Sequence, residues 1–265
     1  FDSYDVIVVG AGHAGCEAAS AAANLGNKTL LITMNMSLMA SMSCNPAVGG
    51  IAKGQIVREI DALGGQMGII ADKTMIQFRM LNKSKGPAVW SPRVQSDKAA
   101  FSLEWRNTLE KTNNLDFWQD NVDHLLVEGD KIKGVHTEMG GDILSRTVIL
   151  TNGTFLNGRI YIGEKSFSGG RISEAASHGL TEQLTELGFE ADRMKTGTPV
   201  RIDGRSINFD KLTEQKGDDE ITGFSFLSIE KPTKQRSCHI AYTSQKVHDI
   251  LRKGFDKSPM FTGRI

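Results

Sequence analysis

The feature that most constrains this chain is a short apolar segment near its start that runs into closely spaced glycines. Residues 5–9 are mostly apolar and predict a strand, and three glycines follow them in G-x-G-x-x-G spacing. The alanine-rich residues 14–25 predict a helix, and residues 29–33 predict a second strand. Strand, glycine turn, helix and strand in this order favour a dinucleotide-binding Rossmann-like α/β fold.

Each glycine of the motif has its own predicted task. Gly10 permits the tight turn, Gly12 lets the backbone approach a pyrophosphate, and Gly15 lets the helix pack close to the strand. The N-terminus of the helix then offers its N–H groups and the positive end of its dipole to the phosphates. The sequence therefore predicts that this turn binds a dinucleotide.

The identity of the dinucleotide depends on two later segments. An acidic residue that holds the ribose is expected about 20 positions after the glycines, but the second strand ends without a carboxylate. Asn35 stands there instead and is a neutral acceptor for a ribose hydroxyl. At this point both FAD and NAD remain open.

The segment 147–154 shifts the interpretation toward FAD. A hairpin with an arm at residues 131–137 precedes it, and the segment reads as a buried strand closed by a turn that contains Thr151 and Gly153. This arrangement is similar to the second flavin-binding element of two-domain flavoproteins. Residues 121–123 are strand-like, at a place where such folds present backbone to adenine. The alternative is an ordinary sheet strand that ends in a glycine turn.

Cys44 is the candidate for covalent chemistry. It lies in a turn rich in Gly and Pro, a few residues before a predicted helix over residues 51–63, where a helix dipole favours a thiolate. Lys53 could assist. The alternative is a buried thiol that acts as a small apolar side chain, which is our expectation for Cys16. Cys238 stands next to a histidine, but no second ligand pair is visible, so we expect no metal site.

Composition sets few further limits. Basic and acidic side chains balance at 31 each, and three widely spaced cysteines argue against a disulfide framework. No apolar run approaches the roughly 18 residues of a membrane helix. The first strand starts almost at residue 1 and leaves no room for a signal peptide, so we expect a reducing cytoplasmic setting and no membrane association.

One stretch has an excess of positive charge. Between residues 73 and 98 there are six basic residues and one acidic residue, together with Trp90. Basic residues interleaved with an aromatic suit phosphate contacts and base stacking in a nucleic-acid interface. The alternative to a nucleic-acid interface is a solvated loop beside the cofactor cleft.

Seven motifs taken together closely resemble the MnmG (GidA) family, the flavoproteins of tRNA wobble-uridine modification. They occur in the family's order at residues 10–15, 43–46, 61–65, 85–89, 168–171, 195–199 and 258–261. The resemblance implies a FAD-binding Rossmann-like domain of the glutathione-reductase type with a smaller inserted α+β domain associated with NADH. We expect the FAD-binding domain at residues 1–200, with a helical excursion near 73–118, and the start of the inserted domain at 201–265.

The resemblance also implies the reaction. The family adds an aminomethyl or carboxymethylaminomethyl group to C5 of uridine 34 in tRNA, with methylenetetrahydrofolate and NADH as co-substrates. Its partner is the GTPase MnmE, and the full-length protein is expected to be a homodimer.

Site residues carry over position by position. Cys44 matches a catalytic cysteine that is thought to add to C6 of the uracil ring, which makes C5 nucleophilic. Lys83, Lys85 and Arg93 would then face tRNA. The expected FAD contacts are Gly10, Ala11, Gly12, His13, Ala14, Gly15, Asn35, Val122, Thr151, Gly153 and Ser177.

The sequence departs from the family by stopping early, because family members are more than twice this length. We therefore expect an N-terminal part of an enzyme that is inactive by itself and holds FAD weakly or not at all. Two alternatives remain: a folate- and FAD-dependent tRNA uridine methyltransferase similar to TrmFO, and a non-catalytic module that binds nucleotides or RNA.

Overall fold

The computed structural model describes residues 3–228, 232 and 234–263. The chain forms two compact units. The first unit comprises Phe1–Asn152 and Lys216–Cys238, and the second comprises Gly153–Gln215 and His239–Ile265. These units are defined by packing and differ from the predicted division at residue 200, which stays a prediction.

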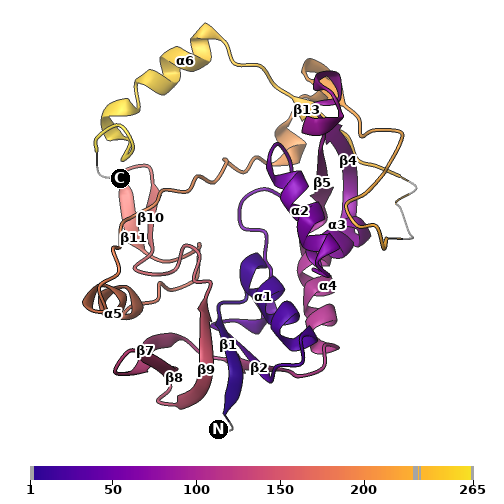
Figure 1. Ribbon diagram of the computed structural model, residues 1–265. Coiled ribbons are helices and arrows are strands. Elements are labelled where there is room, and N and C mark those ends of the chain that lie inside the picture. Colours follow the sequence, from indigo (N-terminus) through magenta and orange to yellow (C-terminus); the bar gives the residue numbers. More distant parts are fainter. Residues whose placement is uncertain (1–2, 229–231, 233, 264–265) are drawn as a thin grey trace. The chain divides into compact units, whose positions relative to one another are not determined.

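A six-stranded sheet organises the first unit (Figure 1). Its order is β6-β2-β1-β9-β8-β7. The four strands β6, β2, β1 and β9 are parallel, whereas β9, β8 and β7 form an antiparallel meander. The bounds are β1 (Tyr4–Val9), β2 (Thr29–Thr33), β6 (Leu115–Gln119), β7 (Val122–Glu128), β8 (Lys131–Thr137) and β9 (Asp142–Leu150). The Rossmann-like α/β class predicted from the glycine motif is confirmed.

The first helix follows the glycine turn as predicted. Helix α1 (His13–Asn24) connects the parallel strands β1 and β2 and packs against both of them. Its buried face consists mainly of small side chains, so the helix can lie close to the sheet. Cys16 on this face is fully buried, and burial raises the pKa of its thiol to about 12. It is a core residue, as the sequence predicts.

Residues 47–110 build a second layer of structure in this unit. Three antiparallel strands lie in the order β3-β5-β4, with helices between and after them along the chain. The bounds are β3 (Ala47–Gly49), α2 (Lys53–Ala62), α3 (Met67–Thr74), β4 (Met75–Leu81), β5 (Ser91–Ser96) and α4 (Lys98–Glu110), with short 3-10 turns at Met36–Leu38, Lys83–Lys85 and Pro87–Val89. Helix α2 agrees with the helix predicted over 51–63.

The predicted helical excursion at 73–118 is mostly wrong. Only α4 and the last residues of α3 are α-helical there, and the rest includes β4, β5 and β6. The physical reason is visible in β4, where the apolar Met75, Phe78 and Met80 are buried and each is followed by a partly exposed residue, with a bulge after Met75. Near-alternating burial suits a strand with one covered face.

The core of the first unit joins both layers. Phe78 of β4 and the α4 residues Phe101 and Trp105 have no exposed surface, and they belong to one cluster with residues of α1, β2 and α3. Asp97 caps α4, because its carboxylate accepts hydrogen bonds of 3.0 Å from the N–H groups of Ala99 and Ala100. The two layers are therefore held as one packed body.

Residues 216–238 complete this unit although they are distant in sequence. The Asp72 carboxylate accepts hydrogen bonds from the N–H groups of Phe224 at 2.8 Å and Ser225 at 2.9 Å. The Phe224 side chain is only 2% exposed. Along β4, the N–H of Arg236 donates to the carbonyl of Ile76 at 2.7 Å. A buried carboxylate and a strand edge thus anchor the segment.

The second unit has less regular structure. Its elements are β10 (Arg159–Ile162), β11 (Lys165–Ser168), α5 (Leu180–Glu186), β12 (Thr213–Gln215), most of β13 (Cys238–Ile240) and α6 (Gln245–Arg252), with 3-10 turns at Gly204–Ser206, Phe209–Lys211 and Phe255–Lys257. Strands β10 and β11 form an antiparallel hairpin.

Within the described ranges, none of the helices combines the length and the apolar character that crossing a membrane requires. All three cysteines are free thiols.

The anchor at Asp72 leads to a stability prediction. Replacing Asp72 with Ala removes the acceptor of two buried N–H groups, and we expect a loss of about 2–4 kcal/mol in the free energy of unfolding at neutral pH. Urea denaturation of the chain measures this loss. Asp130→Ala, in the exposed turn between β7 and β8, is the control and should change stability by about 0.5 kcal/mol or less.

The contribution of Asp72 to the free energy of unfolding should also depend on pH, in a direction that its pKa determines. Burial raises the pKa of the Asp72 carboxyl, so the folded chain keeps this proton at pH values where the unfolded chain has lost it. The resulting stabilisation is complete below the unfolded pKa and is lost as the pH rises through the folded pKa. The advantage of the parent chain over Asp72→Ala should therefore grow as the pH falls from neutral toward about 4, the ordinary pKa of an aspartate. An advantage that shrinks over this range would contradict the assignment.

Candidate functional site

The glycine turn between β1 and α1 has the geometry that its spacing predicts. Gly10 adopts a left-handed backbone with φ of +98°. A Cβ atom on Gly15 would lie 1.7 Å from the carbonyl oxygen of Gly10, so only glycine allows this approach of helix to strand. A Cβ atom on Gly12, in contrast, would have nothing within 4 Å. The space at Gly12 is open, as a site for a ligand requires.

Thr151 closes the same turn from the neighbouring strand. Its N–H donates to the Val9 carbonyl at 2.9 Å, and its hydroxyl lies 2.8 Å from the carbonyl oxygens of Val9 and Gly10. Strand β1 lies between β2 and β9, so the strand order reverses here. In open α/β sheets, ligands bind outside the carboxyl ends of the strands at such a switch point.

The N-terminus of α1 is suited to bind an anion. Gly12 is its N-cap and, among the described residues, no side chain caps the helix there. Its first turn also carries no acidic residue. Because the first N–H groups of a helix have no partner within it, an exposed and uncapped N-terminus suits a phosphate.

The residues predicted for the adenosine half lie at the carboxyl ends of β2 and β6. Between these ends, the N–H of Asp120 donates to the Thr33 carbonyl at 3.0 Å. Asn35 follows β2, and the buried Val122 begins β7 just after β6. The Asn35 amide oxygen accepts a hydrogen bond of 2.8 Å from the N–H of Ser37, so it already serves as a cap. Only its second lone pair and its NH₂ group are left for a ribose.

A cleft of about 500 Å³ lies beside the turn. Its wall combines His13 from the start of α1 with Asn45, the neighbour of Cys44, and with the cations Lys53 and Arg93. The other lining residues are Ala47, Val48, Gly49, Gly50, Ile51, Val57, Met67 and Leu81. His13 is positioned by its Nε2 atom, 3.1 Å from the Ala40 carbonyl oxygen, and by its ring against Phe101. A second hollow, of about 380 Å³ at the ends of α1 and α4, contains no predicted site residue.

The Cys44 side chain is half-buried, and along the chain strand β3 lies between it and the start of α2. The influence of the helix dipole on its thiol stays a prediction. The ammonium group near this loop belongs to Lys98, whose Nζ atom donates to the Cys44 carbonyl at 3.1 Å.

Sequence reasoning missed Lys98. Strand β3 follows the Cys44 loop, and strand β5 precedes Lys98. These two strands pair from Ala47 with Gln95 to Gly49 with Arg93, and only this strand pairing indicates that Lys98 lies near the loop. The same register places Arg93 at the cleft.

The three predicted tRNA-facing cations have different environments. Arg93 lines the cleft, and Lys85 is exposed in the connection between β4 and β5. Lys83 forms an ion pair of 2.9 Å with Asp218. Trp90, at the same connection, is 41% exposed and donates from its indole nitrogen to the Lys83 carbonyl.

Gly153 and Ser177 belong to the second unit. Gly153 has a left-handed backbone with φ of +56°, and the N–H of Ser177 donates to the Phe155 carbonyl at 2.9 Å. Their predicted contacts with FAD stay predictions.

Relatives with curated names match over the whole chain. The tRNA uridine 5-carboxymethylaminomethyl modification enzyme MnmG of Flavobacterium johnsoniae is 65% identical, with all of this chain and 42% of that protein covered. The enzyme of the same name from Cytophaga hutchinsonii is 63% identical, with all of this chain and 43% of that protein covered.

Solved structures of similar proteins also match this chain. Aquifex aeolicus GidA is 45% identical, with a TM-score of 0.95 over 98% of this chain and 44% of that chain. The GidA-related protein from Thermus thermophilus is 25% identical, with a TM-score of 0.52 over 71% of this chain and 70% of that chain.

The family described as glucose inhibited division protein A matches residues 5–265. The chain spans less than half of the length of the MnmG relatives that it matches. By this match over nearly its entire length, the chain belongs to the GidA family.

Proposed function

We propose that this chain is the FAD-binding part of an enzyme that adds a carboxymethylaminomethyl or aminomethyl group to C5 of uridine 34 in tRNA. The similarity to MnmG proteins over the whole chain carries this proposal. The full reaction would use methylenetetrahydrofolate and NADH as co-substrates and the GTPase MnmE as partner. The complete enzyme would be a homodimer in the cytoplasm. Because the chain spans only 42% of its relative, we expect it to be inactive alone.

The first unit fits FAD on its own geometry. The open Gly12, the uncapped N-terminus of α1 and the switch point between β1 and β9 suit a pyrophosphate. Asn35 and Val122, near the carboxyl ends of β2 and β6, are the proposed contacts of the adenosine. Bound FAD would supply a redox-active ring, and the protein's part is to hold and orient it.

Cys44 is the proposed nucleophile toward the uracil ring. A bond from its Sγ atom to C6 would move the electron pair of the C5–C6 double bond toward C5, which then attacks the one-carbon unit. Loss of the C5 proton and departure of the sulfur would restore the double bond. Lys98 would position this loop by holding the Cys44 carbonyl.

The exposed connection between β4 and β5 is the proposed tRNA-facing surface. Lys85 and Trp90 offer a cation and an aromatic face there, and Arg93 brings a second cation to the nearby cleft. Lys83 can contribute only by exchanging its partner Asp218 for a phosphate.

The glycine turn gives a paired test. Gly12→Ala should leave the free energy of unfolding within about 0.5 kcal/mol, because its Cβ meets nothing, yet it should raise the Kd for FAD at least about tenfold by entering the pyrophosphate space. Gly15→Ala is the matched control and should destabilise the fold itself by about 3 kcal/mol or more, since its Cβ meets the Gly10 carbonyl. Flavin absorbance after desalting, in the longer protein that contains this segment, reports FAD binding. Unchanged FAD affinity in Gly12→Ala would refute this pyrophosphate site.

Cys44 is tested in the same longer protein. Cys44→Ser should lower the rate of uridine modification about 10³-fold or more with FAD binding unchanged, because the hydroxyl is a far weaker nucleophile. Cys238→Ser is the matched control, since that half-buried thiol donates a hydrogen bond to the Gln77 side chain and does not line the cleft, and it should retain the rate within a few-fold. Analysis of the tRNA nucleosides measures both variants. The proposed reaction modifies uridine 34, whereas methylation of another uridine would support the TrmFO-like alternative.

A further inference from the structure

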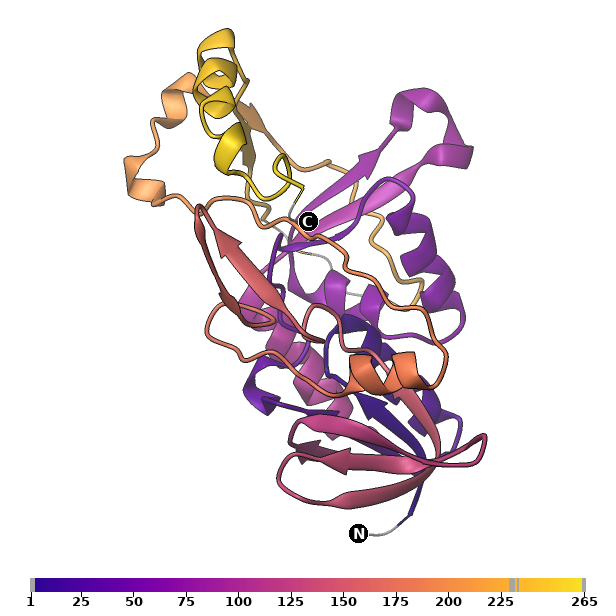
Figure 2. The same ribbon diagram turned by 90° about the vertical axis from the view of Figure 1, so that its left-hand side faces the viewer.

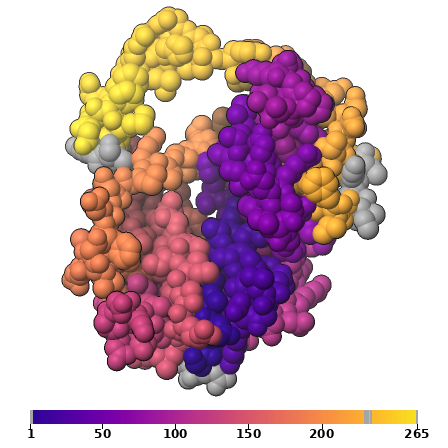
Figure 3. Space-filling model, in the orientation of Figure 1, coloured from indigo at the N-terminus to yellow at the C-terminus, as the bar shows by residue number. Residues whose placement is uncertain are grey.

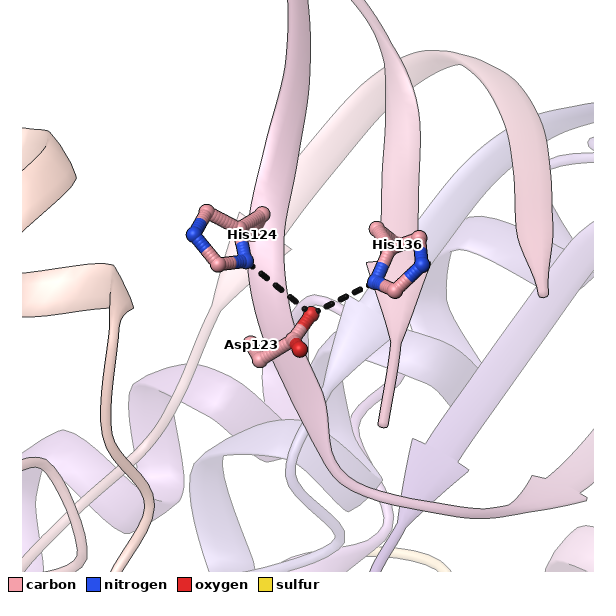
Figure 4. Close-up of side chains that lie close together, drawn as sticks. All are labelled: Asp123, His124 and His136. Atoms are coloured by element: carbon pink, nitrogen blue, oxygen red, sulfur yellow. Dashed lines mark hydrogen bonds and ion pairs between the residues drawn. The ribbon is translucent and has the colours of Figure 1, made fainter. Parts of the chain in front are cut away.

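The meander of β7, β8 and β9 carries a cluster of three potential metal ligands outside the cleft. Asp123 and His124 are neighbours on β7, and His136 lies opposite His124 on β8. Neighbouring side chains on a regular strand point to opposite faces. The pairing between β7 and β8 shifts its register between Val122 and His124, and such an irregularity re-aims side chains. Figure 4 shows both imidazole rings directed at the Asp123 carboxylate.

The distances fit a small metal ion. The Asp123 Oδ1 atom lies 2.8 Å from Nδ1 of His136 and 3.3 Å from Nδ1 of His124. The three ligand atoms all lie within 4.8 Å of one another. In a tetrahedral zinc site with bonds of about 2.0–2.1 Å, neighbouring ligand atoms are about 3.3 Å apart. Small side-chain rotations are therefore sufficient to bring all three atoms to one ion.

We propose that Asp123, His124 and His136 bind a divalent transition-metal ion of the zinc class. Two imidazoles and a carboxylate are the ligand types that Zn²⁺ takes, and Ni²⁺ and Cu²⁺ also favour imidazole. Three protein ligands leave one position for water. The expectation of no metal site was based on Cys238 and its neighbouring histidine. The Asp123 cluster comes from two strands, and the approach of its ligands depends on their register.

Charge and access both favour a cation here. Asp142 pairs with His136 across β8 and β9, and Asp120 also acts electrostatically on His136. Two further carboxylates therefore add negative charge near His136. The side chains of His124, His136 and Asp123 are 57%, 36% and 26% exposed, so an ion can enter from solvent. Strands β7 and β8 lie on the surface in Figure 3, at the lower left.

The meander also limits the movement of the ligands. Strand β8 pairs with β7 on one side and β9 on the other, and β9 continues into the parallel sheet beside β1. Figure 2 shows the three strands as one meander. Because the backbone positions of both histidines are set by strand pairing, binding costs mainly side-chain entropy.

The test is a Zn²⁺ titration of the chain, purified without a histidine tag and stripped with a chelator. Isothermal calorimetry should show one Zn²⁺ per chain, and saturating Zn²⁺ should raise the Tm because only the folded meander brings the ligands together. His124→Asn and His136→Asn should each weaken binding at least about tenfold, and the double variant should abolish it. Asp123→Asn, which keeps the shape but loses the charge, should weaken it as well.

Two controls separate this site from other zinc ligands. His248→Asn removes an exposed histidine of α6, and Cys238→Ser removes the thiol next to His239, so both should retain stoichiometry and affinity. Far-UV circular dichroism checks that each variant is folded. The proposal is overturned if the parent chain does not bind Zn²⁺, if the folded double histidine variant binds it equally well, or if binding is lost in Cys238→Ser instead. Flavin binding and tRNA modification do not enter this test, so it stands apart from the proposed function.

Discussion

The close contact between α1 and the end of β1 is the constraint on which the candidate site depends. At Gly15 the helix lies so near the Gly10 carbonyl that a single methyl group would collide with it. The hydroxyl of Thr151, the residue after β9, donates a hydrogen bond to the same carbonyl. This contact determines where the helix begins, and therefore where its uncapped N–H groups are directed. Gly10 and Gly15 are tightly packed, whereas Gly12 between them is exposed. The space beside Gly12 is therefore open to a ligand.

The second constraint is electrostatic and lies at α3. The Glu17 carboxylate accepts hydrogen bonds from the N–H groups of Gln66 and Met67 at the start of this helix, and the Asp72 carboxylate holds Phe224 and Ser225 near its end. Burial raises the pKa of both acids, yet each is satisfied by backbone donors. Helix α3 thus links α1 to the distant segment 216–238, and this linkage keeps the cleft wall in place.

The fold was largely predictable because its signals are local. The strand, turn and helix at the N-terminus depend on the conformational preferences of single residues. Gly10, for example, adopts the left-handed backbone that the turn requires. The stretch 73–118 was not predictable as helix or strand, because the burial of Phe78 and Met80 depends on packing against other elements. For the same reason the contact between Lys98 and the Cys44 loop was not predictable, since it depends on the antiparallel pairing of β3 with β5.

The sequence by itself determined the dinucleotide-type turn, the order of the first elements and the membership in the GidA family, since these reside in contiguous motifs. Only the tertiary structure decided which residues from separate strands meet. It placed Asn35 and Val122 at the carboxyl ends of β2 and β6, His13 and Arg93 on one cleft, and Asp123 between two histidines. The physical reason is that register and side-chain direction arise from strand pairing and long-range packing, which no local pattern encodes.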